Sequence, residues 1–210
     1  TGKYESKGTA YPVLPSTVPN QTHQADLVGP CYLKGPIRFY SLNVVDTATV
    51  RCELYPARTK SGQTVLDGFR NIWKRIGLPA RVQVDNAMSF YGSRKHPRGM
   101  GPLIRLCLHY GVEPWFIPVA EPWRNGMIES FNDRYQQKFL RKVVMTSMED
   151  LQSKSLCFEE RHNSKYRYSK LKGNTPLKAL SIAKTKLRFP AEDHPPTRRL
   201  EKPLTGRYHV

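Results

Sequence analysis

The pattern of hydrophobic and polar positions along the chain predicts five strands and five helices. Three β-rich runs come first, at residues 22–30, 37–46 and 49–56, and short turns separate them. These runs predict a three-stranded meander. A helix is predicted next, over residues 61–76, because apolar side chains recur there at helical spacing until Gly77 ends the pattern.

The middle of the chain alternates strands with helices. We expect a strand at residues 80–85, a helix at 103–110 and a strand at 112–118. Such alternation is typical of parallel strands joined by crossovers, so the chain is predicted to be an α/β protein with a mixed five-stranded sheet and helices on both faces. Two more helices are predicted at residues 148–162 and 175–183.

One further helix, centred on Glu129, has the strongest pattern. Pro118 and Pro122 exclude a helix upstream, and no Gly or Pro interrupts residues 127–140, so we expect this helix to begin near Asn125. Its predicted buried stripe is Met127, Ile128, Phe131, Tyr135 and Phe139. Its predicted polar face, turned away from the core, holds Glu129, Asn132, Asp133 and Gln136.

Length and composition favour one globular domain with extensions. The 210 residues are 39% hydrophobic and 24% charged, which is ordinary for a folded domain. Residues 1–20 are rich in Pro, Gly, Ser and Thr and are predicted to be an arm or linker, residues 21–183 the core, and residues 184–210 a basic, Pro- and Arg-rich extension. No signal peptide or membrane-spanning run is visible, so we expect a cytoplasmic protein.

The net charge indicates the class of binding partner, and the cysteine spacing indicates the redox environment. Thirty-four Lys and Arg against seventeen Asp and Glu give a net charge of +17, of which +11 lies in residues 134–210. This excess predicts a polyanionic partner, with nucleic acid ahead of an anionic membrane because no basic amphipathic helix is present.

The four cysteines are far apart and lack zinc spacing, so we expect buried or half-buried thiols in a reducing cytosol and no disulfide.

Three carboxylates are candidates for metal binding. Taken singly, Asp26 fits a strand edge, Asp85 fits a turn at a strand end, and Glu129 fits a solvated acid in a first helical turn. Taken together they predict a site, because ligands in α/β sheets gather at the carboxyl ends of the strands. Three adjacent carboxylates repel each other unless a hard cation such as Mg²⁺ or Mn²⁺ offsets the repulsion.

The residues around these carboxylates resemble a known family. The series runs from His23-Gln24-Ala25-Asp26 through Val84-Asp85-Asn86 to Pro122-Trp123-Arg124-Asn125-Gly126-Met127-Ile128-Glu129. It is similar to the integrase catalytic core of insertion-sequence transposases and retroviral integrases. Arg161-His162-Asn163-Ser164 and Gly173-Asn174-Thr175-Pro176 resemble the closing segment of the bacterial members, so the resemblance covers roughly residues 20–183.

This resemblance implies a ribonuclease-H-like fold and a reaction. Asp26, Asp85 and Glu129 would be the catalytic, metal-binding triad for Mg²⁺ or Mn²⁺, and the reaction would be cutting of DNA at element ends and joining of the 3′-hydroxyl to target DNA. The implied partners are double-stranded DNA and further copies of the chain. The implied location is the bacterial cytoplasm, with the nucleoid when DNA is bound.

The sequence departs from the family pattern in two places. The family usually has Gly after the Asp-Asn pair, whereas this chain has Ala87, and Gly allows backbone angles that Ala resists. Glu129 lies 44 positions after Asp85, which is a longer interval than usual in the family, and residues 91–102 account for an insertion. We predict that residues 86–102 form a mobile loop at the mouth of the site.

Candidate DNA contacts follow the same resemblance and the basic charge. Retroviral relatives have basic residues one and two turns after the catalytic Glu, where this chain has Asp133 and Gln136. His162 and the aromatic, basic run of residues 165–168 are candidates for phosphate and stacking contacts, or for an ordinary solvated loop. The predicted DNA-binding residues are Arg124, Asn125, Asn132, Gln136, Lys138, Arg141, Lys142, Lys165 and Arg167.

Two other functions compete with the transposase hypothesis. A nuclease of the same fold would hydrolyse RNA–DNA hybrids without joining strands. A catalytically inactive remnant would bind DNA only, and Ala87 makes that alternative relevant.

Overall fold

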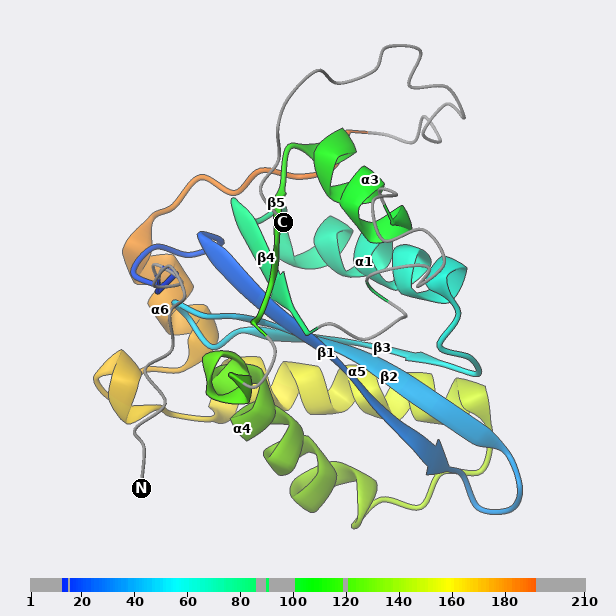
Figure 1. Cartoon of the computed structure of the whole chain (residues 1–210). Helices are drawn as coiled ribbons and strands as arrows, with labels where there is room; N and C mark the ends of the chain where they lie inside the picture. Colours follow the sequence, from blue (N-terminus) through cyan, green and yellow to red (C-terminus); the bar gives the residue numbers. More distant parts are fainter. Residues whose placement is uncertain (1–12, 15, 86–89, 91–100, 119–120, 192–210) are drawn as a thin grey trace, which may run out of the picture.

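A five-stranded sheet forms the centre of the computed structural model, which describes residues 13–14, 16–85, 90, 101–118 and 121–191 (Figure 1). The strand order is β3-β2-β1-β4-β5. The strands are β1 Thr22–Tyr32, β2 Arg38–Asp46, β3 Cys52–Ala57, β4 Arg81–Val84 and β5 Glu113–Phe116. The mixed five-stranded sheet predicted from the sequence is confirmed.

Strand directions follow the predicted topology. The strands β1, β2 and β3 form an antiparallel meander, whereas β4 pairs parallel to β1 on one side and parallel to β5 on the other. Helix α1 (Gly62–Ile76) links β3 to β4, and α3 (Pro102–Tyr110) precedes β5. The parallel half therefore has the helical crossovers that parallel pairing requires.

Helices cover both faces of the sheet (Figure 1). On one face α1 and α3 pack over a core that contains Phe69, Trp73 and Leu106. On the other face α4 (Gly126–Tyr135) and α5 (Met148–Lys165) enclose a second core around Phe131 and Phe158. The remaining helical elements are η1 Pro122–Asn125, η2 Gln136–Leu140, η3 Ser169–Leu171 and α6 Pro176–Ala183.

The ends of α1 show why this helix forms where the pattern places it. The Ser61 side chain accepts a hydrogen bond from the Thr64 amide and so satisfies one of the donors left free at a helix start. At the other end Gly77 has a φ of 91°, a backbone angle that favours glycine, and its amide donates to the Trp73 carbonyl.

The helix that carries Glu129 differs from its prediction in two ways. Its α-helical part ends at Tyr135, and residues 136–140 continue as the π-helix η2. Its buried residues include Asn132, which is only 6% exposed. The prediction that Asn132 faces away from the core is therefore wrong, because its amide finds hydrogen-bond partners inside the molecule.

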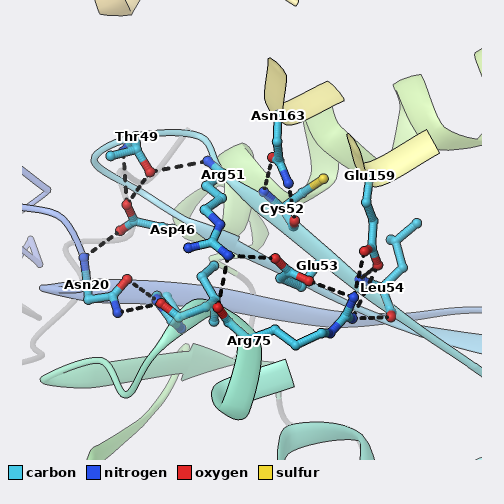
Figure 2. Close-up of polar contacts among 12 residues, drawn as sticks. Asn20, Asp46, Thr49, Arg51, Cys52, Glu53, Leu54, Arg75, Glu159 and Asn163 are labelled. Carbon is cyan, nitrogen blue, oxygen red and sulfur yellow. Dashed lines mark hydrogen bonds and ion pairs between the residues drawn. The ribbon is translucent and has the colours of Figure 1, made fainter. Parts of the chain in front are cut away.

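Side chains from two helices cover the free edge of β3 (Figure 2). Asn163 on α5 accepts from the Cys52 amide and donates to the Cys52 carbonyl, each at 2.9 Å. Glu159 accepts from the Leu54 amide, and Arg75 on α1 donates to the Leu54 carbonyl at 3.0 Å. These bonds occupy the backbone groups that an open edge would offer to another strand.

The predictions on membrane spans, cysteines and the loop after Asp85 have different outcomes. None of the helices in the described part of the chain is long and apolar enough to cross a membrane. All four cysteines are free thiols, but the prediction of burial is wrong for Cys157, which is exposed on α5. The predicted mobile loop and Ala87 lie mostly outside the described residues; within that stretch Phe90 is fully buried in the core beneath α1.

Candidate active site

Two aspartates come together just beyond the point where the parallel pairing of β1 with β4 ends, Asp26 within β1 and Asp85 directly after β4. In the pairing of β1 with β4, Gln24 lies opposite Gln83. Two residues further along each strand, the same register leads to Asp26 and to Asp85, which directly follows β4. Because side chains two residues apart point to the same face, both carboxylates lie on the face that α4 covers.

The surroundings of Asp26 disfavour its charged form. Burial raises the pKa of the Asp26 carboxyl, and the neighbouring Asp85 carboxylate raises it further. Two hydrogen bonds oppose this shift: Oδ1 accepts from the Leu27 amide at 2.7 Å, and Oδ2 accepts from the Asn132 side chain at 2.8 Å. Each oxygen keeps a further lone pair that can bind a cation.

Glu129 belongs to the helix that reaches Asp26. It lies three residues before Asn132 on α4, so the two side chains are neighbours along one side of the helix. The Glu129 side chain is exposed. Within the described residues no three His, Cys, Asp or Glu side chains form a cluster that could hold a metal ion, so Glu129 stays a predicted third ligand.

The donor set nevertheless fits a hard divalent cation. The Asp26 and Asp85 carboxylates interact electrostatically and Asp26 is half-buried, so a cation bound between them would offset their repulsion. All ligands on offer are oxygens, which suit Mg²⁺ or Mn²⁺ better than softer metals.

Two glutamines that the sequence analysis did not single out anchor the start of α4. The side-chain amides of Gln24 and Gln83 both donate to the Arg124 carbonyl, at 2.7 and 2.8 Å. Gln24 also accepts from the Ile128 amide at 3.1 Å. A sequence signal for them exists, since each precedes an aspartate by two residues, as Gln-Ala-Asp and Gln-Val-Asp.

A cavity of about 410 Å³ lies beside the two glutamines. Its wall includes Gln24 and Gln83, the aromatic side chains of Trp115 and Trp123, and Met127 from the first turn of α4. Trp123 is 68% exposed, so an aromatic surface is open to solvent directly before the helix of Glu129.

The nine predicted DNA-binding residues divide by exposure. Arg124 and Gln136 are half-buried, and Asn125 and Asn132 are buried, with their side chains engaged by Gln83 and by Asp26. Direct DNA contact by these two asparagines stays a prediction, one that their burial disfavours. The exposed members are Lys138, Arg141, Lys142, Lys165 and Arg167.

The closing segment, residues 161–164 and 173–176, also helps to hold the fold together, which its sequence did not indicate. His162 is fully buried, and its Nε2 lies 3.0 Å from the Val50 carbonyl, so the prediction of a phosphate contact at His162 is wrong. Its neighbour Asn163 binds the edge of β3. In the adjacent run, Tyr168 is half-buried, and Arg134 lies over its ring, 4.9 Å from the centroid.

Comparison with known proteins agrees with this geometry. The family model described as "Integrase core domain" matches residues 110–176, the segment that contains Glu129 and the closing segment. No curated protein matches the chain in sequence.

Solved structures share the fold at low identity. The HTLV-2 integrase catalytic core domain in complex with magnesium, in its trimeric form, has a TM-score of 0.59 and 15% identity, covering 79% of this chain and 99% of that one. The dimeric form has a TM-score of 0.58 and 15% identity, and the match covers 79% of this chain and 99% of that one. A simian T-cell lymphotropic virus intasome in complex with PP2A regulatory subunit B56 gamma has a TM-score of 0.60 and 13% identity. This match covers 90% of this chain and 66% of that one. Residues 110–176 are therefore similar to an integrase core domain, and the described chain shares its fold with retroviral integrase cores.

Proposed function

We propose that this chain is the catalytic core of a DDE transposase that processes DNA ends and transfers them into target DNA with the help of Mg²⁺ or Mn²⁺. The observation that carries the proposal is the proximity of Asp26 and Asp85 just beyond the last parallel pair of β1 and β4, with the helix of Glu129 bound to Asp26 through Asn132. The magnesium named for the HTLV-2 integrase cores supports the choice of metal.

Each residue of the site has a defined task in this proposal. Asp26, Asp85 and Glu129 would hold the metal, which when bound activates water or a 3′-hydroxyl and offsets charge on the phosphate. Asn132 orients the Asp26 carboxylate by donating to Oδ2. No side chain is proposed as a covalent nucleophile.

The DNA would lie over the exposed basic residues that follow α4. Lys138, Arg141 and Lys142 extend from the carboxyl end of the Glu129 helix, and Lys165 and Arg167 lie at the end of α5. Such side chains bind phosphates without reading the sequence and fix the position of the duplex. We infer that several copies of the chain act together on DNA, and the trimeric and dimeric forms named for the HTLV-2 integrase cores support this.

The test is an oligonucleotide assay that measures end cleavage and strand joining with and without Mg²⁺. Glu129→Gln keeps the shape of the side chain and removes one ligand charge, so joining should fall more than about a hundredfold while DNA binding persists. The matched control is Asp133→Asn, an exposed acid on the same helix, which should stay near wild type.

Other outcomes would identify the competing functions. Metal-dependent hydrolysis without joining would show a nuclease of this fold. DNA binding with neither cleavage nor joining would show an inactive remnant, and full joining by Glu129→Gln would show that Glu129 is only a solvated helix acid.

A further inference from the structure

Two polar side chains lie in the centre of the sheet, where apolar ones are expected. Ser41 and Asn43 on β2 are both 0% exposed. They share a face of the strand with Phe39 and Val45, which belong to the core beneath α4 and α5. Burial of a hydroxyl and an amide costs free energy unless both form hydrogen bonds, so their presence here needs a physical reason.

The two side chains form a continuous series of hydrogen bonds that ends on a predicted metal ligand. The Ser41 hydroxyl donates to Asn43 Oδ1 at 2.6 Å, and Asn43 Nδ2 donates to Asn132 Oδ1 at 2.8 Å. Asn132 Nδ2 then donates to Asp26 Oδ2 at 2.8 Å. Every donor in the series points toward Asp26. Asn43 and Asp26 also lie opposite each other in the β1–β2 pair, so the series connects two neighbouring strand positions through Asn132 on α4.

This direction matters because the two ends of an asparagine amide have nearly the same shape and opposite polarity. If Asn132 turned its amide by 180°, its oxygen would face the Asp26 carboxylate and repel it. The N–H of Asn43 needs an acceptor, and it therefore holds the Asn132 oxygen on its own side and the Asn132 donor toward Asp26. Ser41 donates to the Asn43 oxygen and so satisfies Asn43 in this orientation, and such a series is stronger inside a protein than in water.

We propose that Asn43, supported by Ser41, is a positioning residue for Asp26 and acts through Asn132. This inference rests on the proposed function, since it concerns the metal affinity of that same site. Without Asn43 only Asp26 itself orients the Asn132 amide, so the donor to the Asp26 carboxylate is held less firmly and the site binds a cation less tightly. Loss of a partner behind a metal ligand typically weakens affinity about 10- to 100-fold, and we expect about tenfold here because one residue intervenes.

The test measures Mn²⁺ binding to the DNA-free chain by titration calorimetry, beside urea unfolding. Asn43→Leu keeps the size of the side chain and removes its hydrogen bonds, so the Kd for Mn²⁺ should rise about tenfold. The matched control is Asn163→Leu, which removes a similarly buried amide with two hydrogen bonds at the edge of β3. It should lower stability while the Kd for Mn²⁺ stays within about twofold of wild type.

A second variant keeps the inference testable if Asn43→Leu does not fold. Ser41→Ala removes one oxygen and should raise the Kd about threefold, since Asn43 keeps its other bond. A Kd equal to wild type in whichever of these variants folds would overturn the inference and leave Asn43 as a satisfied core residue. A wild-type chain that binds no Mn²⁺ at all would overturn the proposed metal chemistry itself.

Discussion

The imidazole of His162 is fully buried among aromatic side chains, with ring centroids 5.1 Å from Phe131 and 6.3 Å from Phe158. The pKa of His162 is lowered from 6.5 to about 4: burial is the main cause, the hydrogen bond with the Val50 carbonyl opposes it in part, and the charge of Arg134 adds a smaller lowering. The ring is therefore neutral in the folded chain at pH values where it is protonated in the unfolded chain.

This shift predicts a loss of stability in mild acid. As pH falls below 6.5 the unfolded chain binds a proton that the folded chain does not bind until about pH 4, so the free energy of unfolding falls, by about 2 kcal/mol between pH 7 and pH 5. His162→Gln keeps a donor for the Val50 carbonyl and does not titrate. In urea unfolding at both pH values, this variant should lose about 2 kcal/mol less than wild type over the interval; identical losses in the two proteins would contradict the prediction.

At the scale of elements, one carbonyl group links the start of α4 to two strands. Gln24 from β1 and Gln83 from β4 both donate to the Arg124 carbonyl, so two strands hold the turn that precedes the Glu129 helix. This arrangement is redundant, because either glutamine alone still satisfies the carbonyl. Removal of both leaves a partly buried acceptor without these donors, which costs more than the loss of one bond.

The redundancy predicts a stability change that is larger than additive. Gln24→Leu and Gln83→Leu should each lower the free energy of unfolding by about 1 kcal/mol, and the double variant should exceed their sum by about 1 kcal/mol. Urea unfolding of the four proteins measures this coupling. Gln63→Leu, at an exposed position on α1, is the control and should change stability by less than about 0.5 kcal/mol. Strictly additive losses would show that the two glutamines act independently.

The edge of β3 shows a second element whose surroundings come from distant parts of the chain (Figure 2). Arg75 lies 2.7 Å from Glu159 and 2.9 Å from Glu53, so α1 and α5 are joined around the edge strand by ion pairs. Burial raises the pKa of Glu159 to about 7, and repulsion from Glu53 adds to the shift. Asn163 from the closing segment and Glu159, one turn before it on α5, bind backbone groups of β3 and so keep this strand from pairing with another strand.

At the scale of the whole molecule, a cluster of exposed basic residues lies on the α4 side of the sheet. The exposed basic residues Lys138, Arg141 and Lys142 follow α4, whereas Arg70 lies on α1, on the opposite face, and is paired with Asp67 at 3.0 Å. We therefore expect DNA on the α4 side. Counterion release makes binding through phosphates fall steeply as salt rises.

This charge distribution predicts which variants change the salt dependence of DNA binding. Arg141→Gln and Lys142→Gln should each weaken binding of a duplex and reduce the slope of log K against log salt by about 1. Fluorescence anisotropy over a salt series gives both quantities. Arg70→Gln removes the same charge from the other face and should leave the slope unchanged; an equal effect of all three variants would show that only net charge matters.

Much of the fold could be predicted from local pattern alone. The helices around Phe69 and Phe131 and the strands around Ala25 and Val44 are amphipathic or continuously apolar, and that pattern forms the two cores on either side of the sheet. Asp26, Asp85 and Glu129 stand out because carboxylates are unexpected there or match a family series. These features depend on a few neighbouring residues, so the sequence shows them directly.

The buried polar network was decided only by the tertiary structure. Asn132 has the spacing of a solvent-facing residue, and His162 stands beside basic residues, yet each is buried because a partner more than 80 residues away satisfies its hydrogen bonds. Such partners leave no periodic pattern in the sequence, since a donor and an acceptor need only meet in space. The sequence by itself therefore determined the strands and the helices and predicted three carboxylate ligands, and the packing of α4 on the sheet decided which polar side chain holds Asp26 in place.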